Sequence, residues 1–573
     1  MIRPLQGSYF MKCHTSAKHA ALLLAAAPLF AAHAADPLPV DIGTILQQVQ
    51  PSQPFPAPPR GEGPALNKED NTPPPPERPA VSVDVTSIKI LGNTLVDTDT
   101  LHGLVADAEG KRLTLDQLDE MATRISRYYR GRGQSFARAV VPAQVISSGV
   151  VRFLVIEARY GKVGIDNQTR VNDVLLQATA APLQGGQAVE QALLDKSLLL
   201  MSDIPGVLVQ ATLRPGDGLG SSDLSIQVTP GQAVSGNLAL DDYGNSFTGR
   251  GRLGGTVYFN NPFRRGDVLG VGGLSSGSGV NYGRVSYESL LNGQGTRGGA
   301  AYSMLNYKIG GSLQELGAHG SAETESLWGR HPLLRSQAAN VYGQVQYDNL
   351  QLRERIDMAG MKTDRHLGSW TSSLSGDWRD ILLSGGINTW SLAWTRGRLG
   401  FDVAEARLSD AASARTEGWF SKTNLNFSRL QRWGDRGSLY VSWAGQWANT
   451  NLDSSQKMSV GGPYSVRAYD VSALSGDAGY RGSVELRYDL GAVGGGRLQA
   501  LAFWDGAYLK VNQRPWTAGT NTATFSGAGV GLDWSGYNQW RARAYLASPL
   551  GTAPELVKAP DAMRMWTELA YRF

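Results

Sequence analysis

The segment that decides the fold is Ser438-Leu439-Tyr440-Val441-Ser442-Trp443-Ala444-Gly445-Gln446-Trp447, because its side chains alternate in type from one residue to the next. Leucine, valine and tryptophan occupy positions 439, 441, 443 and 447, and serine, tyrosine and glutamine occupy positions 438, 440, 442 and 446. An alternation with a period of two is typical of a β-strand with one apolar and one polar face. Tryptophan and tyrosine near strand ends favour a membrane interface over a soluble sheet.

The same alternation recurs through the second half of the chain, for example in Thr389–Thr395, Lys422–Phe427 and Val484–Asp489. From Val234 to Phe573 it forms sixteen runs of roughly 21 residues each with their connections, which fits membrane strands of about 9–11 residues. The last run is expected to close against the first, Val234–Tyr243, so that no strand edge faces lipid. The sequence therefore predicts a sixteen-stranded antiparallel transmembrane β-barrel over residues 232–573, with both barrel ends in the periplasm.

The composition agrees with a barrel and argues against other classes. The chain has 69 Gly, 14 Trp and 21 Tyr, but only 18% charged residues. Its mean hydropathy is −0.24, and no stretch after residue 35 has the apolar length of a transmembrane helix. The formal net charge of +4 is too weak and too evenly spread to indicate nucleic-acid binding.

The first 34 residues read as a signal peptide for export. Basic residues precede an apolar run, Ala20–Ala32, and Ala32-His33-Ala34 supplies small residues at the spacing of a cleavage site. Either Met1 or Met11 could start translation. The single cysteine, Cys13, lies within this segment, so the mature chain is expected to have no disulfide and no thiol chemistry.

Residues 35–50 read as a short amphipathic helix, and residues 51–80 read as a linker. The apolar face of the helix recurs at helical spacing, and Pro51 ends the pattern. The linker is so rich in proline that we expect no helix or sheet there, only an extended, semi-rigid tether. The residues that define the helix face are Ile42, Ile45, Leu46 and Val49.

Residues 81–231 read as a tandem repeat of two small α+β units, 81–159 and 160–231. Each unit is expected to run strand, helix, helix, strand, strand. The clearest helix start is Thr114, which forms a capping box with Gln117. Phe136–Val141 and Val207–Leu213 are candidate sheet edges at which an extended polypeptide could add as a strand.

Two motifs remain in the barrel region. The first is Gly461-Gly462-Pro463-Tyr464-Ser465-Val466-Arg467-Ala468-Tyr469-Asp470, and the second is Phe503-Trp504-Asp505. With these residues in view, the chain resembles the two-partner secretion transporters, which export haemolysins and filamentous adhesins across the outer membrane. The resemblance covers essentially the whole mature chain.

The resemblance assigns a role to each motif. Val466, Arg467, Ala468 and Tyr469 are similar to the V-R-G-Y motif at the tip of the sixth extracellular loop, which folds back into the barrel, although Ala468 replaces the usual glycine. Phe503 and Asp505 are similar to the F-x-D motif on an inward-facing strand, and the resemblance implies that Arg467 pairs with Asp505. Asn260-Asn261-Pro262 resembles a periplasmic turn between the second and third strands.

The resemblance also implies the rest of the architecture and the partners. Residues 35–50 would be a plug helix, and the two α+β units would be POTRA domains that bind a large secreted exoprotein of haemolysin or adhesin type. Outer-membrane lipids surround the barrel, and the barrel assembly machinery inserts it. No cofactor is expected, because the chain has no nucleotide-binding loop and the exoprotein's folding outside the cell would drive transport.

Three other functions are alternatives to secretion for a barrel of this kind. An insertase of the same superfamily is the main alternative, but such proteins usually carry more POTRA units and no tethered plug helix. A passive porin does not need POTRA units. A barrel enzyme is disfavoured, because the histidines after the signal segment stand in no metal-ligand spacing and beside no nucleophile motif; they are His102, His319, His331 and His366.

Overall fold

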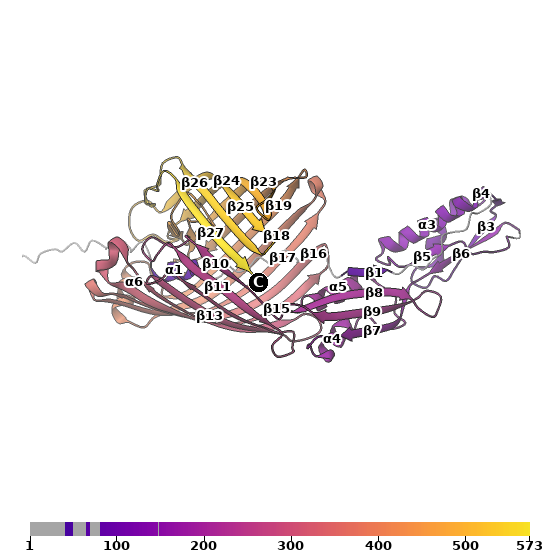
Figure 1. Ribbon diagram of the computed structural model, residues 1–573, viewed down its shortest axis with the longest axis horizontal. Coiled ribbons are helices and arrows are strands. Elements are labelled where there is room, and N and C mark those ends of the chain that lie inside the picture. Colours follow the sequence, from indigo (N-terminus) through magenta and orange to yellow (C-terminus); the bar gives the residue numbers. More distant parts are fainter. Residues whose placement is uncertain (1–40, 50–64, 69–80, 147) are drawn as a thin grey trace, which may run out of the picture. The chain divides into compact units, whose positions relative to one another are not determined.

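The computed structural model describes residues 41–49, 65–68, 81–146 and 148–573, and the expected signal peptide lies outside this range. Sixteen antiparallel strands close into a barrel in chain order, which confirms the predicted fold (Figure 1). The first eight are β10 (Val234–Asp241), β11 (Arg252–Asn260), β12 (Val268–Ser275), β13 (Val280–Leu290), β14 (Arg297–Lys308), β15 (Ala318–Arg335), β16 (Ala339–Ile356) and β17 (Met361–Asp380). The other eight are β18 (Gly386–Phe401), β19 (Gly418–Trp433), β20 (Gly437–Ala448), β23 (Ala478–Val493), β24 (Gly496–Lys510), β25 (Thr522–Gly536), β26 (Trp540–Leu550) and β27 (Arg564–Arg572).

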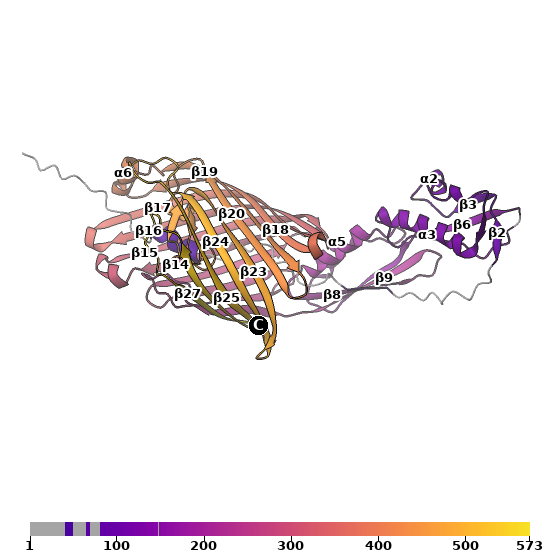
Figure 2. The same cartoon turned by 90° about the horizontal axis from the view of Figure 1, so that it is seen from above.

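The barrel closes where the sequence pattern places the closure. Strand β10 pairs with β27 from Asn237↔Arg572 to Asp241↔Glu568, and it pairs with β11 on its other side. Alternate side chains separate the two faces of each strand: Trp504 is 47% exposed on the outer wall, whereas its neighbour Asp505 is fully buried. The strands run steeply across the barrel wall when it is seen from above (Figure 2).

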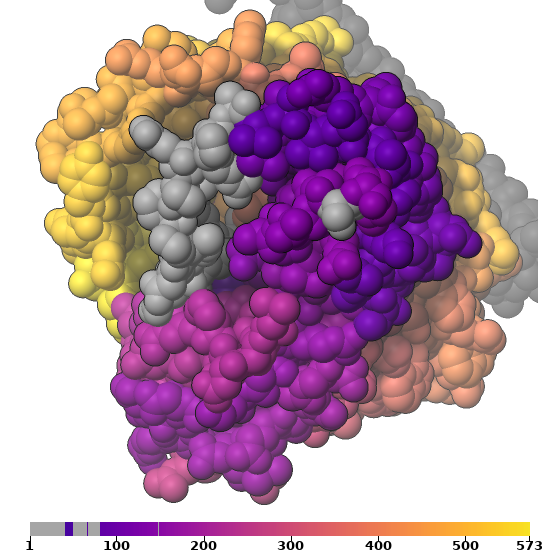
Figure 3. All heavy atoms as spheres, turned by 90° about the vertical axis from the view of Figure 1, so that its right-hand side faces the viewer, coloured from indigo at the N-terminus to yellow at the C-terminus, as the bar shows by residue number. Residues whose placement is uncertain are grey.

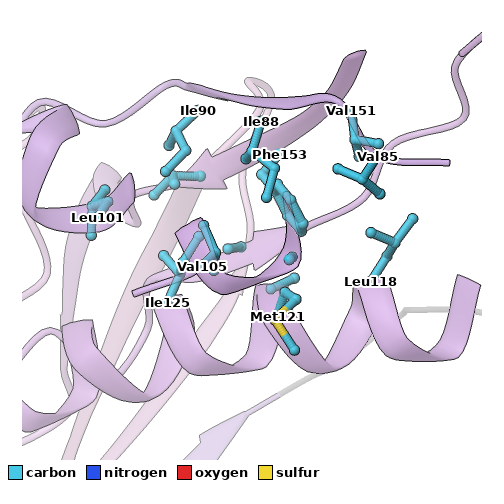
Figure 4. Packing of buried hydrophobic residues seen from close by; sticks show 14 of the residues in the cluster. Val85, Ile88, Ile90, Leu101, Val105, Leu118, Met121, Ile125, Val151 and Phe153 are labelled. Carbon is cyan, nitrogen blue, oxygen red and sulfur yellow. The ribbon is translucent and has the colours of Figure 1, made fainter. Parts of the chain in front are cut away.

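After the linker, the described chain resumes at residue 81 and forms the first α+β unit. Its elements are β2 (Ser82–Asp84), β3 (Ser87–Leu91), α2 (Thr98–Gly103), the 3-10 turn η1 (Ala106–Ala108), β4 (Arg112–Thr114), α3 (Leu115–Gly131), β5 (Arg138–Val140) and β6 (Val150–Ile156). The sheet order is β3-β6-β5. Helix α3 begins at the expected capping box of Thr114 and Gln117. Its face with Leu118, Met121 and Ile125 packs against the sheet residues Ile88 and Phe153 (Figure 4).

A buried carboxylate holds the loop that follows β3. Glu157 accepts hydrogen bonds from the backbone nitrogens of Thr94 and Leu95, both at 2.8 Å, and from the Tyr129 hydroxyl at 2.9 Å. Burial alone would raise the pKa of Glu157, but these bonds and one from the Thr94 hydroxyl outweigh it and leave the pKa below its ordinary value. Its contribution to stability is therefore present above the ordinary pKa of 4.5 and is lost as the pH falls through the lower folded-state pKa.

We expect Glu157→Gln to loosen this unit at neutral pH, because the amide donates where the carboxylate accepts. Hydrogen exchange of α3 amides, measured by mass spectrometry on the full chain, should be faster in the variant than in the wild type at pH 7. The difference should persist down to about pH 4.5 and shrink below it. A difference that grew towards acid pH would contradict this role of the carboxylate.

The second unit runs strand, helix, helix, strand, strand, without counterparts of β2, η1 and β4. Its elements are β7 (Arg159–Asn167), α4 (Asp173–Ala180), α5 (Gln191–Ser202), β8 (Val207–Pro215) and β9 (Ser221–Pro230). Helices α4 and α5 cover the sheet with a core that includes Leu176, Leu194 and Leu198. In the space-filling view the first unit appears in indigo and the second in purple (Figure 3).

The prediction that residues 51–80 form no sheet was wrong for one segment. Strand β1 (Ala65–Lys68) lies within this range and pairs in parallel with β8, from Ala65↔Gln210 to Lys68↔Leu213. These four residues contain no proline, so their backbone groups can join a ladder, and Leu66 packs against the core of the second unit. The candidate edge Val207–Leu213 is therefore already covered.

Helix α1 (Ile42–Val49) is the described part of the helix expected over residues 35–50. Ile42 and Ile45 are fully buried, Leu46 is 3% exposed and Val49 is 9% exposed, so the expected apolar face is the buried face. No helix among the described residues is long and apolar enough to cross a membrane.

Candidate functional site: an inserted loop and a helix in the barrel lumen

The loop between β20 and β23 carries the first motif. It contains the short 3-10 turn η5 (Ser454–Gln456) and an antiparallel hairpin of β21 (Met458–Val460) and β22 (Leu474–Gly476). Gly461 and Gly462, with φ of 114° and 94°, turn the chain directly after β21 in a conformation that other residues rarely adopt. The tip beyond this turn packs against the inner wall of β24, β25 and β26 through Val466, Ala468 and Tyr469.

Arg467 at the loop tip contacts the second motif on β24. Its Nη2 and Nε donate to the two carboxylate oxygens of Asp505 at 2.7 and 2.8 Å, and its backbone nitrogen donates to the same group at 3.1 Å. Both side chains are buried, with relative exposures of 4% and 0%. A two-pronged guanidinium–carboxylate contact is directional as well as strong, so it fixes the orientation of the loop tip and its position.

The Arg467 guanidinium has further partners that no sequence motif indicated. Its Nη1 donates to Glu485 at 2.8 Å, and its Nη2 donates to the Ser483 hydroxyl at 3.0 Å. Glu485 in turn accepts from Nε of Arg487 at 2.8 Å. Two arginines and two carboxylates thus form a charge-balanced chain on the luminal wall, in which each buried charge has a partner.

Aromatic rings complete the environment of Arg467. The guanidinium carbon lies 3.4 Å from the centroid of the Phe503 ring and 5.3 Å from that of Tyr545. The indole nitrogen of Trp566 donates to the Arg467 carbonyl at 2.7 Å. Phe503 therefore contributes a cation–π face directly beside the carboxylate of the same motif.

The strand phase explains why Asp505 can reach the loop. On β24, Phe503 and Asp505 are buried in the lumen, while Trp504 between them points outward. Because successive side chains on a strand point to opposite faces, an outward tryptophan fixes its neighbours inward. The same rule places Glu485 inward on β23, next to Val484 on the outer wall.

Ala468 stands where the related motif usually has glycine, and the structure accommodates its methyl group. The φ angle of Ala468 is not positive, so the backbone at this position does not require glycine. Its Cβ faces Gly527 of β25: a Cβ built on Gly527 would lie only 2.4 Å from that of Ala468. Gly527 therefore provides the space that the alanine occupies.

Helix α1 lies within the barrel against η5 and strands β14 to β16 (Figure 1). The side-chain amide of Gln47 donates to the carbonyls of Ser454 and Lys457, at 2.9 and 2.8 Å. The amide of Gln48 donates to the Ser472 hydroxyl at 3.0 Å. The helix thus contacts both arms of the inserted loop.

The first turn of α1 rests on a buried charge cluster of the wall. The backbone nitrogen of Ile42 donates to Glu354 at 3.1 Å, where an anion complements the amino end of a helix. Glu354 also accepts from the Tyr307 hydroxyl at 2.8 Å and pairs with Arg365 at 3.3 Å. Arg365 pairs with Asp453 of the loop at 2.7 Å, so one arginine links wall, helix and loop.

A cavity of about 1510 Å³ opens beside the end of α1 and the loop tip. Its wall carries arginines on several strands, among them Arg252, Arg284, Arg481 and Arg543. Gln47, Gln48 and Tyr464 form its border towards the helix and the loop. The lumen therefore contains open space beside the carboxyl end of the helix.

The other residues singled out in the sequence lie elsewhere. Asn261 has a positive φ of 56° in the turn between β11 and β12, as expected of a tight connection, but it is not part of the luminal site. The four histidines lie apart, each beside a different partner, for example His331 with Thr296 and His366 with Asp402. Within the described residues, no three His, Cys, Asp or Glu side chains form a metal-binding group.

A closed sixteen-stranded barrel, two tandem helix-covered sheets and a loop inserted in the lumen define an outer-membrane transporter with POTRA domains. Residues 220–534 match the family of the haemolysin secretion/activation proteins ShlB/FhaC/HecB, and residues 83–158 match the ShlB-type POTRA domain. The chain belongs to this ShlB/FhaC/HecB family. Its barrel lies in the outer membrane and its POTRA domains lie in the periplasm.

Known relatives agree with this assignment, and a solved structure shares the fold. The heme/hemopexin transporter protein HuxB of Haemophilus influenzae is 26% identical over 496 residues, covering 85% of this chain and 87% of that protein. The outer membrane transporter CdiB of Escherichia coli is 25% identical over 467 residues, covering 78% and 76%. The structure of CdiB from Escherichia coli has a TM-score of 0.68 at 23% identity and covers 88% of this chain and 93% of that chain.

The structure of BamA from Haemophilus ducreyi lacking POTRA domains 1–3 shares the fold alone, with a TM-score of 0.51 at 13% identity and coverage of 86% and 100%. Because the chain belongs to the family of haemolysin secretion/activation proteins, secretion is favoured over the insertase alternative.

Proposed function

We propose that this transporter receives one large exoprotein in an unfolded state at its POTRA domains and passes it through the barrel lumen to the cell surface. The observation that carries the proposal is that the helix in the lumen is held there by non-covalent contacts alone. Helix α1 is held by side-chain hydrogen bonds and one charge cluster, with no covalent link to the wall. An unfolded chain needs a wide path, and the cavity beside α1, with its luminal arginines, supplies the beginning of one.

The first contact is proposed at the edge of β5. Strand β5 pairs with β6 on one side, and among the described residues no strand covers its other side. The Ala139 nitrogen on that side donates to the Ser126 hydroxyl of α3 at 2.9 Å. A single hydroxyl is easier to displace than a strand, so an extended segment can add between β5 and α3. Main-chain pairing tolerates varied sequences, which suits a long polypeptide partner.

The second contact is proposed at β8, where β1 now occupies the edge. The ladder between β1 and β8 spans four residue pairs, and Leu66 is the side chain of β1 that packs on the core. An incoming strand would compete with β1 for the same backbone groups. Since β1 and α1 belong to the same N-terminal segment, release of β1 would free the tether of the plug helix as the substrate arrives.

We expect Leu66→Asp to increase severalfold the affinity of the full chain for an unfolded fragment of the exoprotein that it secretes. The charge removes the packing of β1 without changing β8, so the edge becomes available. The measurement is fluorescence anisotropy of the labelled fragment in detergent. The matched control is Leu219→Asp, the same change at an 81% exposed residue of the same domain. Equal affinities for the wild type and both variants would show that β1 does not compete with the substrate.

A further inference from the structure

The turn between β17 and β18 exposes three consecutive aliphatic side chains. Ile381, Leu382 and Leu383 are 95%, 62% and 74% exposed. The turn includes the short 3-10 segment η4 (Leu382–Ser384), in which Leu383 and Ser384 have φ of 49° and 74°. Left-handed backbone at two non-glycine residues is unfavourable and persists only where neighbouring groups hold it.

Four polar side chains hold this turn. Arg429 donates to both carboxylate oxygens of Asp380, at 2.6 and 3.0 Å, and Asn388 donates to the same carboxylate at 2.8 Å. The side-chain amide of Gln431 donates to the carbonyls of Leu382, Leu383 and Gly385, at 3.1, 2.7 and 3.1 Å. The tip formed by Ile381, Leu382 and Leu383 is therefore a fixed structure; we call it the apolar tip.

The apolar tip lies against the outer wall of the barrel. Asn388 is in register with Trp378 on one side and with Arg429 on the other, and Asp380 lies two residues beyond Trp378 on the same strand face. Trp390 and Phe427 are paired two residues further along this face. Trp378 is 36% exposed on the lipid-facing side and its ring packs 6.2 Å from that of Phe427. The polar residues therefore point outward, below these aromatic rings, and the turn folds over them.

The level of the tip along the barrel axis corresponds to the periplasmic boundary of the bilayer. Strand β17 ends at the periplasmic side, and Trp370, 58% exposed, lies on its outward face nearer the extracellular side. A tilted strand crosses the hydrocarbon region of the bilayer in about 9–11 residues. Counted from Trp370 towards the periplasm, this length ends near Asp380. Polar side chains at that level on the lipid side need a cover, and Asn388 is only 1% exposed beneath the turn.

We propose that the apolar tip inserts among the phospholipid acyl chains of the periplasmic leaflet. The occupant is lipid because the tip continues the lipid-facing wall, between Trp378 and the 67% exposed Trp433 of the next hairpin. Tryptophans of this kind mark the membrane interface, and an exposed aliphatic group beside them belongs on its apolar side. The tip fixes the depth of the barrel in the bilayer, at the periplasmic end of the barrel, where the chain arrives from the POTRA domains.

The test uses a fluorescent NBD label on single cysteines in the full-length protein, reconstituted in phosphatidylcholine vesicles. The single cysteine of the chain, Cys13, lies in the expected signal peptide, so each introduced cysteine is labelled alone. The test variant is Leu382→Cys. A matched periplasmic control is Asp435→Cys in the exposed turn between β19 and β20, and a lipid-facing control is Leu327→Cys, at a position 60% exposed on β15.

The label at 382 should emit at a blue-shifted wavelength like the label at 327. Lipids brominated in the middle of the acyl chain should quench it at least threefold more than the label at 435. Adding Gln431→Ala should release the turn and lower this quenching. Quenching at 382 equal to that at 435 would overturn the proposal and leave the tip as a contact surface for a periplasmic protein. Quenching unaffected by Gln431→Ala would overturn the holding role of the polar network.

Discussion

Arg467→Ala should reduce secretion of the exoprotein by at least an order of magnitude while the barrel still assembles. The substitution leaves Asp505 and Glu485 buried without their shared cation. Removing one partner of a buried ion pair costs about 3–5 kcal/mol, and the wet lumen should reduce that cost. The loop tip should therefore lose its seat on β24. Secretion is measured in culture supernatants, and assembly is measured by heat-modifiable migration in gels.

The double variant tests whether the two residues act as one unit. Asp505→Ala alone should have the same phenotype as Arg467→Ala, and combining them should be no worse than either. Arg497→Ala, which breaks the ion pair of a 66% exposed arginine on the same strand β24 with Asp489, is the matched control and should secrete normally. Losses that add fully in the double variant would show that Arg467 and Asp505 act separately.

Glu485 changes the expectation for a charge swap between positions 467 and 505. A carboxylate at position 467 would face Glu485, which now accepts from Arg467 at 2.8 Å. Reversing both charges should therefore recover little secretion. An Arg467–Asp505 pair without the nearby Glu485 would be expected to recover more. Arg467→Lys keeps the charge but cannot form the two-pronged contact, so an intermediate defect is expected.

Deleting residues 36–50 should raise single-channel conductance severalfold in planar bilayers. The deletion removes α1 with its contacts to Glu354 and to the loop, and joins the space that α1 fills to the cavity beside it. Leu408→Ala on the surface helix α6 (Ala404–Ala412), a residue 70% exposed, should leave conductance unchanged. Unchanged conductance after the deletion would mean that α1 does not obstruct the pore.

The barrel was predictable because its signal is local. Every second residue of a lipid-facing strand must be apolar, and runs such as Leu439 to Trp447 show this without knowledge of their neighbours. Strand β1 was missed because the prolines around it dominate the composition, although Ala65–Lys68 itself has none. A short strand that completes another sheet carries almost no pattern of its own.

The luminal contacts were less predictable, because the residues that form them are far apart in the sequence. The resemblance to a family motif suggested Arg467 and Asp505, but nothing linked them to Ser483 or Glu485. Glu485 was visible only as a polar residue on the inward face of an alternating run. The partners of α1 could not be found, since Ile42 contacts Glu354 across 312 positions and Gln47 contacts Ser454 across 407.

The central claim is that the exoprotein passes through the lumen that α1 now occupies, and a reversible crosslink tests it most directly. Gln48 of α1 lies against the loop, since its side-chain amide donates to the Ser472 hydroxyl at 3.0 Å. Gln48→Cys with Ser472→Cys, joined by a short thiol-cleavable bismaleimide, should therefore tie the helix to the loop, and the only other cysteine, Cys13, lies in the expected signal peptide. With each single variant as a control, secretion by the crosslinked double variant should stop and should resume when a reductant cleaves the crosslink. Equal secretion before and after cleavage, with the crosslink verified, would contradict passage through this lumen.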